Sequence, residues 1–586
     1  TRTGDGHTQM KLSKNLAALA AFAVLLVLLV GGLSAVQSRM NAIRIDEKLT
    51  DTEPLENAPP MVVLTTVALG GFRGLVADWL WLRSNRMQEQ GNYFEMVQLA
   101  SWITKLQPRF TGATAFLAWN MAYNVSVTFT SPEDRWRWVR RGIELIRDEA
   151  LEYNPSDPEL FQQLGWIYQH KMGKDLDDAN RYYKTQFALE MIMVFGDYAG
   201  KWDLIGRAAP TEAKLKAQLG GDDAFWTVLA SRGLTFAALE KEFRKNGLLP
   251  DDLVAELDRR GIREPVELCL RRRWLLEKYR LIPELILRLN DTYGPLDWRL
   301  PEAHAIYWAT RGKEQWDEHE DNFKRLQCDR MIFQSLNAAF QGGRLVYIRD
   351  VQMLTMTPNI DLADATRKAY DDAMGLYGES TVRGAFQNFM VDAIVNLYKF
   401  GRKQKAAEFF RDARQRFGNR FSGGLDEFVL HELGEDMKTP NYNQAQGTVE
   451  AYIEQMCLNL AIGEAEQAAY YELIARKLHA KYQEFAGEST KARRWLPPFD
   501  QMKRSYISGP LRSRMPEPLY NLLMAQLPDE LKAREAFDLQ RRAGVVEAPP
   551  GAPGAPAEAP AAPAEAPAAP AGEAPPAAQP APAPQP

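Results

Sequence analysis

The stretch at residues 150–168, ALEYNPSDPELFQQLGWIY, decides the fold of this chain. Pro155 marks the end of one helix, because proline lacks an amide hydrogen and its ring clashes with the preceding turn. Apolar or small residues then recur at the three- and four-residue spacing of one helix face: Phe161, Leu164, Gly165 and Tyr168. The small residues Ala150 and Gly165 would let neighbouring helices approach closely, while the aromatic residues fill the space between helix pairs.

These spacings resemble the tetratricopeptide repeat (TPR), whose first helix carries W-x2-L-G-x2-Y and whose second helix ends with a small residue five positions before a proline. Phe161-x2-Leu164-Gly165-x2-Tyr168 matches the first pattern, and Ala150-x4-Pro155 matches the second. Weaker copies of the register follow at Ala305, Trp308 and Gly312, and at Ile394, Leu397, Gly401, Ala406, Phe410 and Ala413. The resemblance implies an all-α solenoid of degenerate helical hairpins; unrelated antiparallel helical hairpins are the alternative.

The rest of the body also has a helical pattern, because β-branched runs with period two are nearly absent. We expect TPR-like repeats at residues 61–200 and 298–545. Between them, at 201–297, the register disappears and short charged amphipathic segments predict an inserted helical subdomain. Residues 546–586 form an Ala/Pro-rich tail that cannot bury a core and should be disordered, extended and solvated.

A short basic tail at residues 1–15 precedes an apolar run from Leu16 to Val36 that contains no charged residue. At about 1.5 Å per residue, such a helix crosses a hydrocarbon core of about 30 Å. A cleaved signal peptide is the rival interpretation, but the run exceeds the ~7–15 residues of a typical signal core. We therefore expect one transmembrane helix, followed by an acidic stalk at residues 37–60.

Basic residues flank this run on both sides, so their count does not settle the orientation. A short tail before a very long C-terminal domain is typical of a signal anchor, whose distal domain is translocated. We expect a single-pass protein of the bacterial inner membrane with its bulk in the periplasm. A second span from Met61 to Leu82 would reverse this topology, but its uncharged part ends at Phe72 and is too short. This stretch should instead lie on the membrane or pack on the first repeat.

The charge balance argues against nucleic acid as a partner. The chain has 71 basic and 76 acidic residues and a formal net charge of -5, so no large positive field is implied. Cys269, Cys328 and Cys457 are far apart in sequence and form no CxxC pair, which predicts buried small hydrophobic residues.

Catalytic motifs are missing from the sequence. It contains no GxxxxGK[ST], GxGxxG or GxSxG pattern. His431-Glu432 begins like the zinc-binding HExxH motif, but Glu435 occupies the position of the second histidine. We therefore expect no metal, no cofactor and no enzymatic activity, although residues scattered along a chain can still form a catalytic site.

Two groups of residues are candidates for partner binding. The first follows the stalk and comprises Arg73, Asp78, Trp79, Trp81, Trp102, Trp119 and Asn120. Aromatic residues with a guanidinium are typical of a protein-binding hot spot or of a membrane-interface belt, but tryptophans at helical spacing also pack in cores. Trp79 and Trp81 cannot share a face, because residues two apart on a helix diverge by about 200°.

The second group is Trp298, Arg299 and His304, in a loop that leads into a helix. The neighbouring Pro301 and Glu302 indicate a helix start, with a proline and an acid in its first turn.

Together these features predict a membrane-anchored scaffold that binds one or more protein partners in a bacterial envelope complex. The alternative is a helical solenoid that binds or processes envelope glycans. A third possibility is a structural element whose tail reaches across the envelope.

Overall fold

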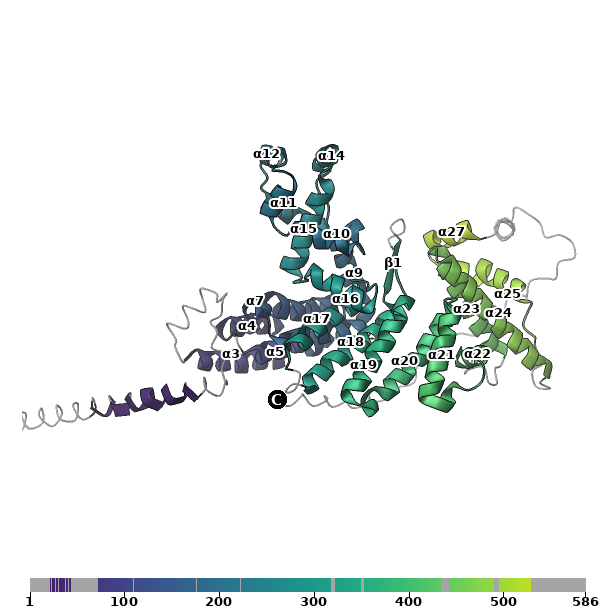
Figure 1. Ribbon diagram of the computed structural model, residues 1–586, viewed down its shortest axis with the longest axis horizontal. Helices are drawn as coiled ribbons and strands as arrows, with labels where there is room; N and C mark the ends of the chain where they lie inside the picture. Colours follow the sequence, from purple (N-terminus) through teal and green to yellow (C-terminus); the bar gives the residue numbers. More distant parts are fainter. Residues whose placement is uncertain are drawn as a thin grey trace, which may run out of the picture. The chain divides into compact units, whose positions relative to one another are not determined.

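The computed structural model describes scattered residues between 22 and 43 and the ranges 72–108, 110–174, 176–221, 223–317, 322–348, 353–433, 442–488 and 495–527. Within these ranges the chain is mostly α-helical, as the sequence predicts (Figure 1). The expected basic tail at 1–15 and Ala/Pro tail at 546–586 lie outside the described residues. Part of the expected anchor and most of the expected stalk also lie outside the described residues.

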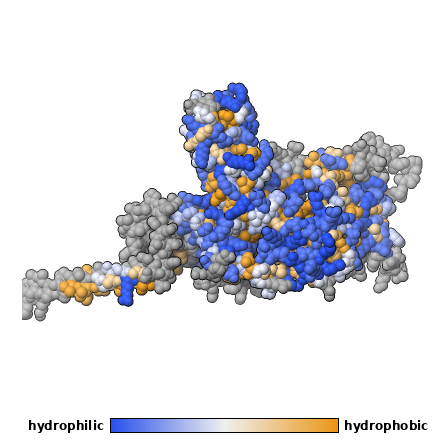
Figure 2. Space-filling view, in the orientation of Figure 1, coloured by the Kyte–Doolittle hydropathy of each residue, from blue (hydrophilic) through white to orange (hydrophobic). Residues whose placement is uncertain are grey.

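The described residues between 22 and 43 are helical, and their large apolar side chains are exposed. Figure 2 shows this segment as mostly hydrophobic, whereas the visible face of the body is mostly hydrophilic. In the part of the chain that the structure describes, no helix combines the length and the apolar character needed to cross a bilayer.

The first block of helices extends to residue 198. Its elements are α3 (Phe72–Glu89), α4 (Tyr93–Leu106), α5 (Thr111–Asn120), the π-helical turn η1 (Met121–Val125), the 3-10 turn η2 (Ser126–Thr128), α6 (Pro132–Glu144), the π-helical turn η3 (Leu145–Ala150), α7 (Leu151–Tyr153), α8 (Pro158–Trp166), the π-helical turn η4 (Ile167–Gly173), α9 (Asn180–Phe195) and the 3-10 turn η5 (Gly196–Tyr198). Helix α8 begins at Pro158, because the Asp157 carboxylate accepts a hydrogen bond from the amide of Leu160 and Pro158 occupies the first turn.

The second block consists of shorter helices. They are α10 (Trp202–Arg207), α11 (Glu212–Gln218), α12 (Asp223–Ser231), α13 (Phe236–Asn246), α14 (Asp251–Arg260), α15 (Arg263–Lys278) and α16 (Pro283–Tyr293). In Figure 1, α11, α12 and α14 lie together at a distance from the helices that follow this block.

Buried Arg271 of α15 joins this block to the first one. Its guanidinium donates to the carbonyl oxygens of Met193 and Val194 at the end of α9, and to that of Gly247 after α13, at 2.8–3.1 Å. Burial lowers the pKa of Arg271, and the nearby Glu267 opposes that shift. One buried cation therefore satisfies carbonyls that two helix ends leave without intrahelical partners.

The third block contains α17 (Pro301–Gln315), α18 (Asn322–Gly342), β1 (Arg344–Ile348), β2 (Met353–Thr357), the 3-10 turn η7 (Ile360–Leu362), α19 (Ala363–Tyr377), α20 (Glu379–Lys399), α21 (Lys403–Phe417), the 3-10 turn η8 (Gly418–Phe421), α22 (Leu425–Leu433), α23 (Tyr442–Ala461) and α24 (Ala465–Glu488). Consecutive helices from α17 to α21 pack on one another, and α20 also contacts α18, α22 and α24.

Helices α8 and α17 pack against each other although the whole second block separates them in sequence. Small residues make this possible: a Cβ at Gly165 would lie 3.3 Å from the Ala309 nitrogen, and one at Gly312 would lie 3.4 Å from the Pro158 oxygen. Beside them, the rings of Phe161 and Trp308 stack with centroids 5.7 Å apart. The first and third blocks therefore share one hydrophobic core.

A two-stranded antiparallel hairpin, β1–β2, interrupts the helices, and the sequence pattern did not predict it. Arg344 pairs with Thr357 and Ile348 with Met353. Asp297 accepts a hydrogen bond from the Leu345 amide at 2.8 Å, and Arg299 donates to the Leu345 oxygen at 2.7 Å. The loop before α17 thus fastens the hairpin to the helices.

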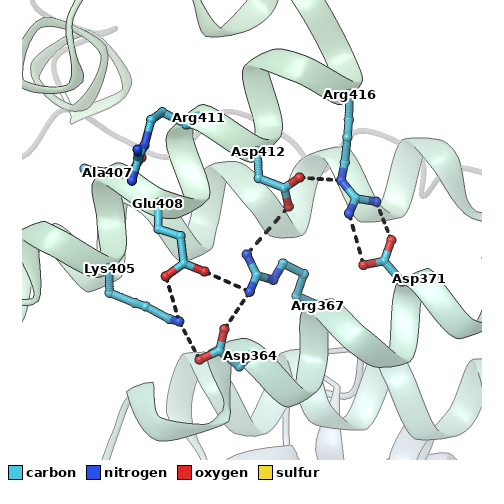
Figure 3. Close-up of polar contacts among 9 residues, drawn as sticks. All are labelled: Asp364, Arg367, Asp371, Lys405, Ala407, Glu408, Arg411, Asp412 and Arg416. Carbon is cyan, nitrogen blue, oxygen red and sulfur yellow. Dashed lines mark hydrogen bonds and ion pairs between the residues drawn. The ribbon is translucent and has the colours of Figure 1, made fainter.

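An ion-pair network links α19 to α21 (Figure 3). Arg367 of α19 contacts Asp364 at 2.9 Å, Glu408 at 3.0 Å and Asp412 at 3.6 Å. Lys405 joins Asp364 and Glu408, and Arg416 joins Asp371 and Asp412. Because α20 lies between them in sequence, the network ties together alternate helices of the block.

A second compact unit begins at Pro497, and the structure describes it as far as Leu527. Its described elements are α25 (Phe499–Tyr506), the π-helical turn η10 (Ile507–Leu511), α26 (Arg512–Arg514) and α27 (Glu517–Gln526). Tyr520 of α27 donates to the Ile507 oxygen at 3.3 Å, and the Arg512 guanidinium lies over the Tyr520 ring. These contacts hold α27 against the turn.

Candidate partner-binding site

Six aromatic side chains from α3, α5–η1 and α8–η4 form a continuous row, which we call the aromatic strip. In order along the row they are Trp81, Phe116, Trp119, Tyr123, His170 and Trp166, with successive ring centroids 5.4, 5.9, 5.6, 5.7 and 4.5 Å apart. Phe116 is 39% exposed and the other five are half-buried. The strip is therefore anchored in the body but reaches solvent.

Local helix geometry explains how the strip arises. Phe116, Trp119 and Tyr123 are three and four residues apart, and Trp166 and His170 are four apart, so each set lies on one helix face. Tyr123 lies in the π-helical turn η1, and His170 lies in η4. Such wide turns are rare and frequently occur at functional sites.

Charged side chains flank the middle of the strip. The Lys171 ammonium lies 5.3 Å from the centroid of the Tyr123 ring and 2.5 Å from the Asp177 carboxylate, while Arg135 binds the same carboxylate at 3.0 Å. Burial favours a raised pKa of Asp177, but the hydrogen bonds from Lys171, the Ala179 amide and Tyr183, together with the Lys171 charge, outweigh burial and lower the pKa. Burial lowers the pKa of Lys171 despite this partner.

Lys174 also flanks the strip, and its hydrogen-bond partner is uncharged. Its ammonium donates to the Gln334 side-chain oxygen at 3.2 Å, and burial lowers its pKa. No carboxylate of the described residues forms an ion pair with it. Lys174 is therefore available to an incoming acid.

The two titratable rings of the strip are neutral at pH 7. Burial raises the pKa of Tyr123. Burial, followed by the charges of Lys174 and Lys171, lowers the pKa of His170 to about 4. Neither the Tyr123 hydroxyl nor Nδ1 of His170 has a hydrogen-bond partner among the described residues. The strip thus combines apolar ring surface with two unused polar atoms, which a ligand could bind after a small adjustment.

Uncharged amides line the strip beside α5. The Gln88 side-chain nitrogen donates to the side-chain oxygen of Asn120 at 3.0 Å, and that of Asn124 donates to the same oxygen at 2.9 Å. Asn120 is buried and Asn124 is exposed. Amides carry both donors and acceptors, so this edge can recognise either a peptide backbone or hydroxyl groups.

The structure brings together only some of the residues expected from the sequence. Trp81, Trp119 and Asn120 lie in or beside the strip. Trp79 and Trp102 are 57% and 53% exposed on α3 and α4, outside it. Trp79 does lie on a different face from Trp81, and it packs under the Arg83 guanidinium. Asp78 is exposed on α3. Arg73 belongs to α3, but its side chain lies outside the described residues.

Trp298 and His304 of the second candidate group are buried in the core, at 0% and 1% exposure. His304 shares a hydrogen bond with the Trp298 oxygen at 2.9 Å, and Arg299 binds Asp297 with two nitrogens. The structure therefore gives these residues packing roles rather than a place on a binding surface. The loop that leads into α17 packs against the β1–β2 hairpin, and the sequence did not reveal this hairpin.

Sequence reasoning missed four members of the strip: Phe116, Tyr123, Trp166 and His170. Their helical spacing was visible in the sequence. What it did not show is that α5 and α8 present these faces toward each other.

Metal ligands do not gather elsewhere in the described ranges: they contain no group of three His, Cys, Asp or Glu side chains arranged to hold a metal ion. His431 is exposed and lies 3.7 Å from Glu432, and Glu435 is outside the described residues. Cys269, Cys328 and Cys457 are buried, as expected, and burial raises the pKa of Cys269 and Cys328 to about 11 and 12.

Comparisons with known proteins found no matching family model, no similar curated protein and no similar solved structure. The site must therefore be interpreted from its own geometry.

Proposed function

We propose that this protein is a membrane-anchored, TPR-like scaffold that binds a partner protein in a bacterial envelope complex through the aromatic strip. The observation that carries the proposal is the strip itself: six rings from three neighbouring helical segments, half-exposed and flanked by cations and amides. Binding hot spots are enriched in such aromatic side chains because they contribute large contact area with little loss of conformational freedom.

The packing of the helices supports a repeat architecture. In a solenoid of helical hairpins, each helix contacts both its neighbour and the next helix but one. Helix α20 contacts α18 and α22 as well as α19 and α21, and ion pairs connect α19 with α21. Small-against-aromatic contacts between α8 and α17 are those expected from the TPR-like register.

The outward face of α3 supports anchoring near a membrane. Leu75, Trp79 and Leu82 follow one another at four- and three-residue spacing and are 57–66% exposed. Exposed leucines beside a tryptophan are typical of helices at a lipid interface. This face follows the apolar run and the expected stalk in sequence, and we propose that run as the single transmembrane anchor, with the body in the periplasm.

Site-specific photocrosslinking tests the binding role. A photoreactive phenylalanine derivative at Phe116, in the full chain in native membranes, should give one or a few reproducible partner bands. The same group at Phe94, which is 84% exposed on α4 outside the strip, is the matched control. Equal yields at both positions, or no product at Phe116, would refute the proposal.

A labelling test of the membrane topology needs an introduced cysteine, because the native cysteines are buried. We expect Gln415→Cys, at an exposed position of α21, to react with a membrane-impermeant maleimide in intact spheroplasts. Labelling only after permeabilisation would place the body in the cytoplasm and overturn the proposed orientation.

A second candidate function is glycan binding, favoured by the amide edge formed by Gln88, Asn120 and Asn124 next to the tryptophan rings. Titration of envelope glycan strands onto the full chain would decide this. Saturable binding that is lost in Trp119→Ala but kept in Trp102→Ala would favour this function over protein binding.

A further inference from the structure

Helix α3 carries apolar side chains on two opposite sides. Ala77 and Leu80 are buried in the core, whereas Leu75, Trp79 and Leu82 are 57–66% exposed. The exposed three are separated by four and three residues, so they form one row along the helix. Because a helix on a protein surface normally presents polar residues to water, a row of this kind marks a surface that contacts something else.

Exposed apolar side chains are concentrated in this part of the body. Seven exposed large apolar residues lie between Leu75 and Phe116, and ten lie in the whole of the described chain beyond Phe116. Single exposed apolar residues scattered over a surface need no explanation, but a concentration of them indicates an interaction surface.

Helix α4 packs beside α3 (Figure 1) and adds a second tryptophan to the same side. Arg83 of α3 lies over the Trp79 ring, 5.6 Å from its centroid, and forms an ion pair with Glu95 of α4. Trp102 follows Glu95 by about two helical turns and is 53% exposed. Trp79 and Trp102 therefore share one side of the α3–α4 hairpin. We call it the hairpin face, and it comprises Leu75, Trp79, Leu82 and Trp102.

Cations without carboxylate partners extend the hairpin face at both ends. Arg86 follows Leu82 by four residues near the end of α3, and Lys105 follows Trp102 by three near the end of α4. Because a short turn joins the two helices and they run in opposite directions, the two cations lie at opposite ends of the face. Neither cation forms an ion pair with any residue that the structure describes.

Two acids flank the hairpin face along one edge. Asp78 and Glu89 are exposed on α3, and they lie about 120–140° around the helix from Arg83, the side chain that points toward α4. Neither acid forms an ion pair with Arg86. The face itself is therefore apolar in its middle and positive at its two ends.

The surface that complements the hairpin face is apolar opposite its middle and anionic opposite its ends. A lipid bilayer offers both, because its acyl chains lie directly beneath a layer of phosphates. Tryptophans are enriched at that boundary, and the long side chains of arginine and lysine reach from apolar surroundings to the phosphates. The charge complementarity of Arg86 and Lys105 therefore favours a membrane as the occupant.

We propose that the hairpin face lies in the head-group region of the bilayer, with its apolar row against the acyl chains and with Arg86 and Lys105 paired to lipid phosphates. This inference rests on the proposed function, because the proposed anchor brings the body to the membrane. Trp81 of the aromatic strip lies about 200° around α3 from Trp79. The strip therefore stays accessible to a partner protein while the hairpin face contacts lipid.

The test uses the full chain reconstituted in lipid vesicles, with Leu82→Cys labelled by a nitrobenzoxadiazole fluorophore. The native cysteines are buried and do not compete for the label. We expect nitroxide groups on the lipids to quench this fluorophore at least about threefold more than the same fluorophore at Leu376→Cys. Leu376 of α19 is the matched control, because it is 60% exposed and Leu82 is 66% exposed. Equal quenching at the two positions would overturn the inference.

The charge of the lipids tests the contacts of Arg86 and Lys105. Quenching at Leu82→Cys should be about twofold stronger in vesicles of equal parts phosphatidylcholine and phosphatidylglycerol than in phosphatidylcholine alone, and salt should reduce this difference. Arg86→Gln combined with Lys105→Gln should abolish the difference. Lys214→Gln combined with Lys241→Gln, which removes two exposed cations of the second block, should preserve it. A difference that survives in the Arg86 and Lys105 variant would contradict the proposed phosphate contacts.

Flotation of the vesicles on a density gradient separates this inference from the proposed function. If the chain floats with the vesicles but quenching at Leu82 and Leu376 is equal, the anchor stands and only the lipid contact of the hairpin face fails. If the chain stays at the bottom of the gradient, the proposed anchoring fails as well. A photoreactive phenylalanine derivative at Trp79 should give no protein adduct in native membranes. A reproducible protein band there would assign the hairpin face to a protein partner and overturn the inference.

Discussion

Gly165 of α8 lies so close to Ala309 of α17 that a Cβ at Gly165 would be 3.3 Å from the Ala309 nitrogen, and 3.4 Å from the Ala305 oxygen. This contact joins helices from the first and third blocks of the fold. It depends on the absence of a side chain at Gly165.

Replacement of Gly165 by valine should therefore destabilise the protein. The branched side chain would have to push α17 away from α8, and overpacking of this kind costs about 1–3 kcal/mol. Urea unfolding followed by circular dichroism measures the effect. Gly375→Val in α19 is the control, because nothing lies within 4 Å of a Cβ there. Equal midpoints for the two variants would contradict the close packing of α8 and α17.

Arg271→Met should loosen the attachment of α13 and α15 to α9. The substitution leaves three carbonyl oxygens without their buried donor. We expect this loss to lower the free energy of unfolding by about 3 kcal/mol. Hydrogen exchange should accelerate at the end of α9 and in α13 before it does so elsewhere. Arg259→Met, which removes an exposed arginine from α14, should leave exchange unchanged; a uniform acceleration across all helices would argue against a local role.

Arg367→Ala should have a smaller effect that depends on salt. Arg367 contacts three carboxylates but is partly exposed, and exposed ion pairs each contribute less than about 1 kcal/mol. We expect the free energy of unfolding to fall by about 1 kcal/mol at low ionic strength and by less in 1 M salt. Arg411→Ala is the control, since Arg411 donates to Ala407 of its own helix (Figure 3). A loss that salt does not alter would point to packing on Phe409 instead.

The buried His304 should make the fold sensitive to acid. Burial lowers the pKa of His304 to about 4, so the unfolded chain, with a histidine pKa near ~6.5, binds the proton first as the pH falls. The contribution of His304 to the free energy of unfolding is therefore fully present above about pH 6.5. It is lost progressively as the pH falls from 6.5 to 4, and the loss is about 2 kcal/mol at pH 5.

His304→Gln, which keeps a donor for the Trp298 oxygen, should flatten this part of the pH dependence of thermal unfolding. Because burial also lowers the pKa of His170, a smaller acid sensitivity should persist in the variant. His431→Gln at an exposed position is the control. An unchanged slope in His304→Gln would show that His304 does not carry the effect.

The helical class could be predicted from the sequence because amphipathic spacing is a local property. The boundary at Pro155 and the buried face of Phe161, Leu164 and Tyr168 are confirmed for the same reason. The β1–β2 hairpin was missed because residues 349–352, Arg-Asp-Val-Gln, contain no glycine or asparagine turn signal. Its strands are also held by Asp297 and Arg299, far away in sequence.

The candidate site could be predicted only in part. Trp81 and Trp119 stood out because they belong to the group of tryptophans that follows the stalk, whereas Trp166, Tyr123 and His170 did not. Their position follows from how α5 and α8 pack, which depends on contacts over long sequence separations. Trp298 and His304 have the same residue types as a binding site, but burial gives them another role. Composition alone does not distinguish an aromatic residue in a core from one on a surface.

The packing of α8 on α17 also means that the parts of the chain before and after residues 201–297 pack directly against each other. A protease that cuts the chain inside this stretch, for instance after Arg232 near the exposed Gly233 turn, would not separate its two products. The fragments would stay associated through the interface at Gly165. A gene split at that codon should therefore yield halves that reassemble when they are produced together.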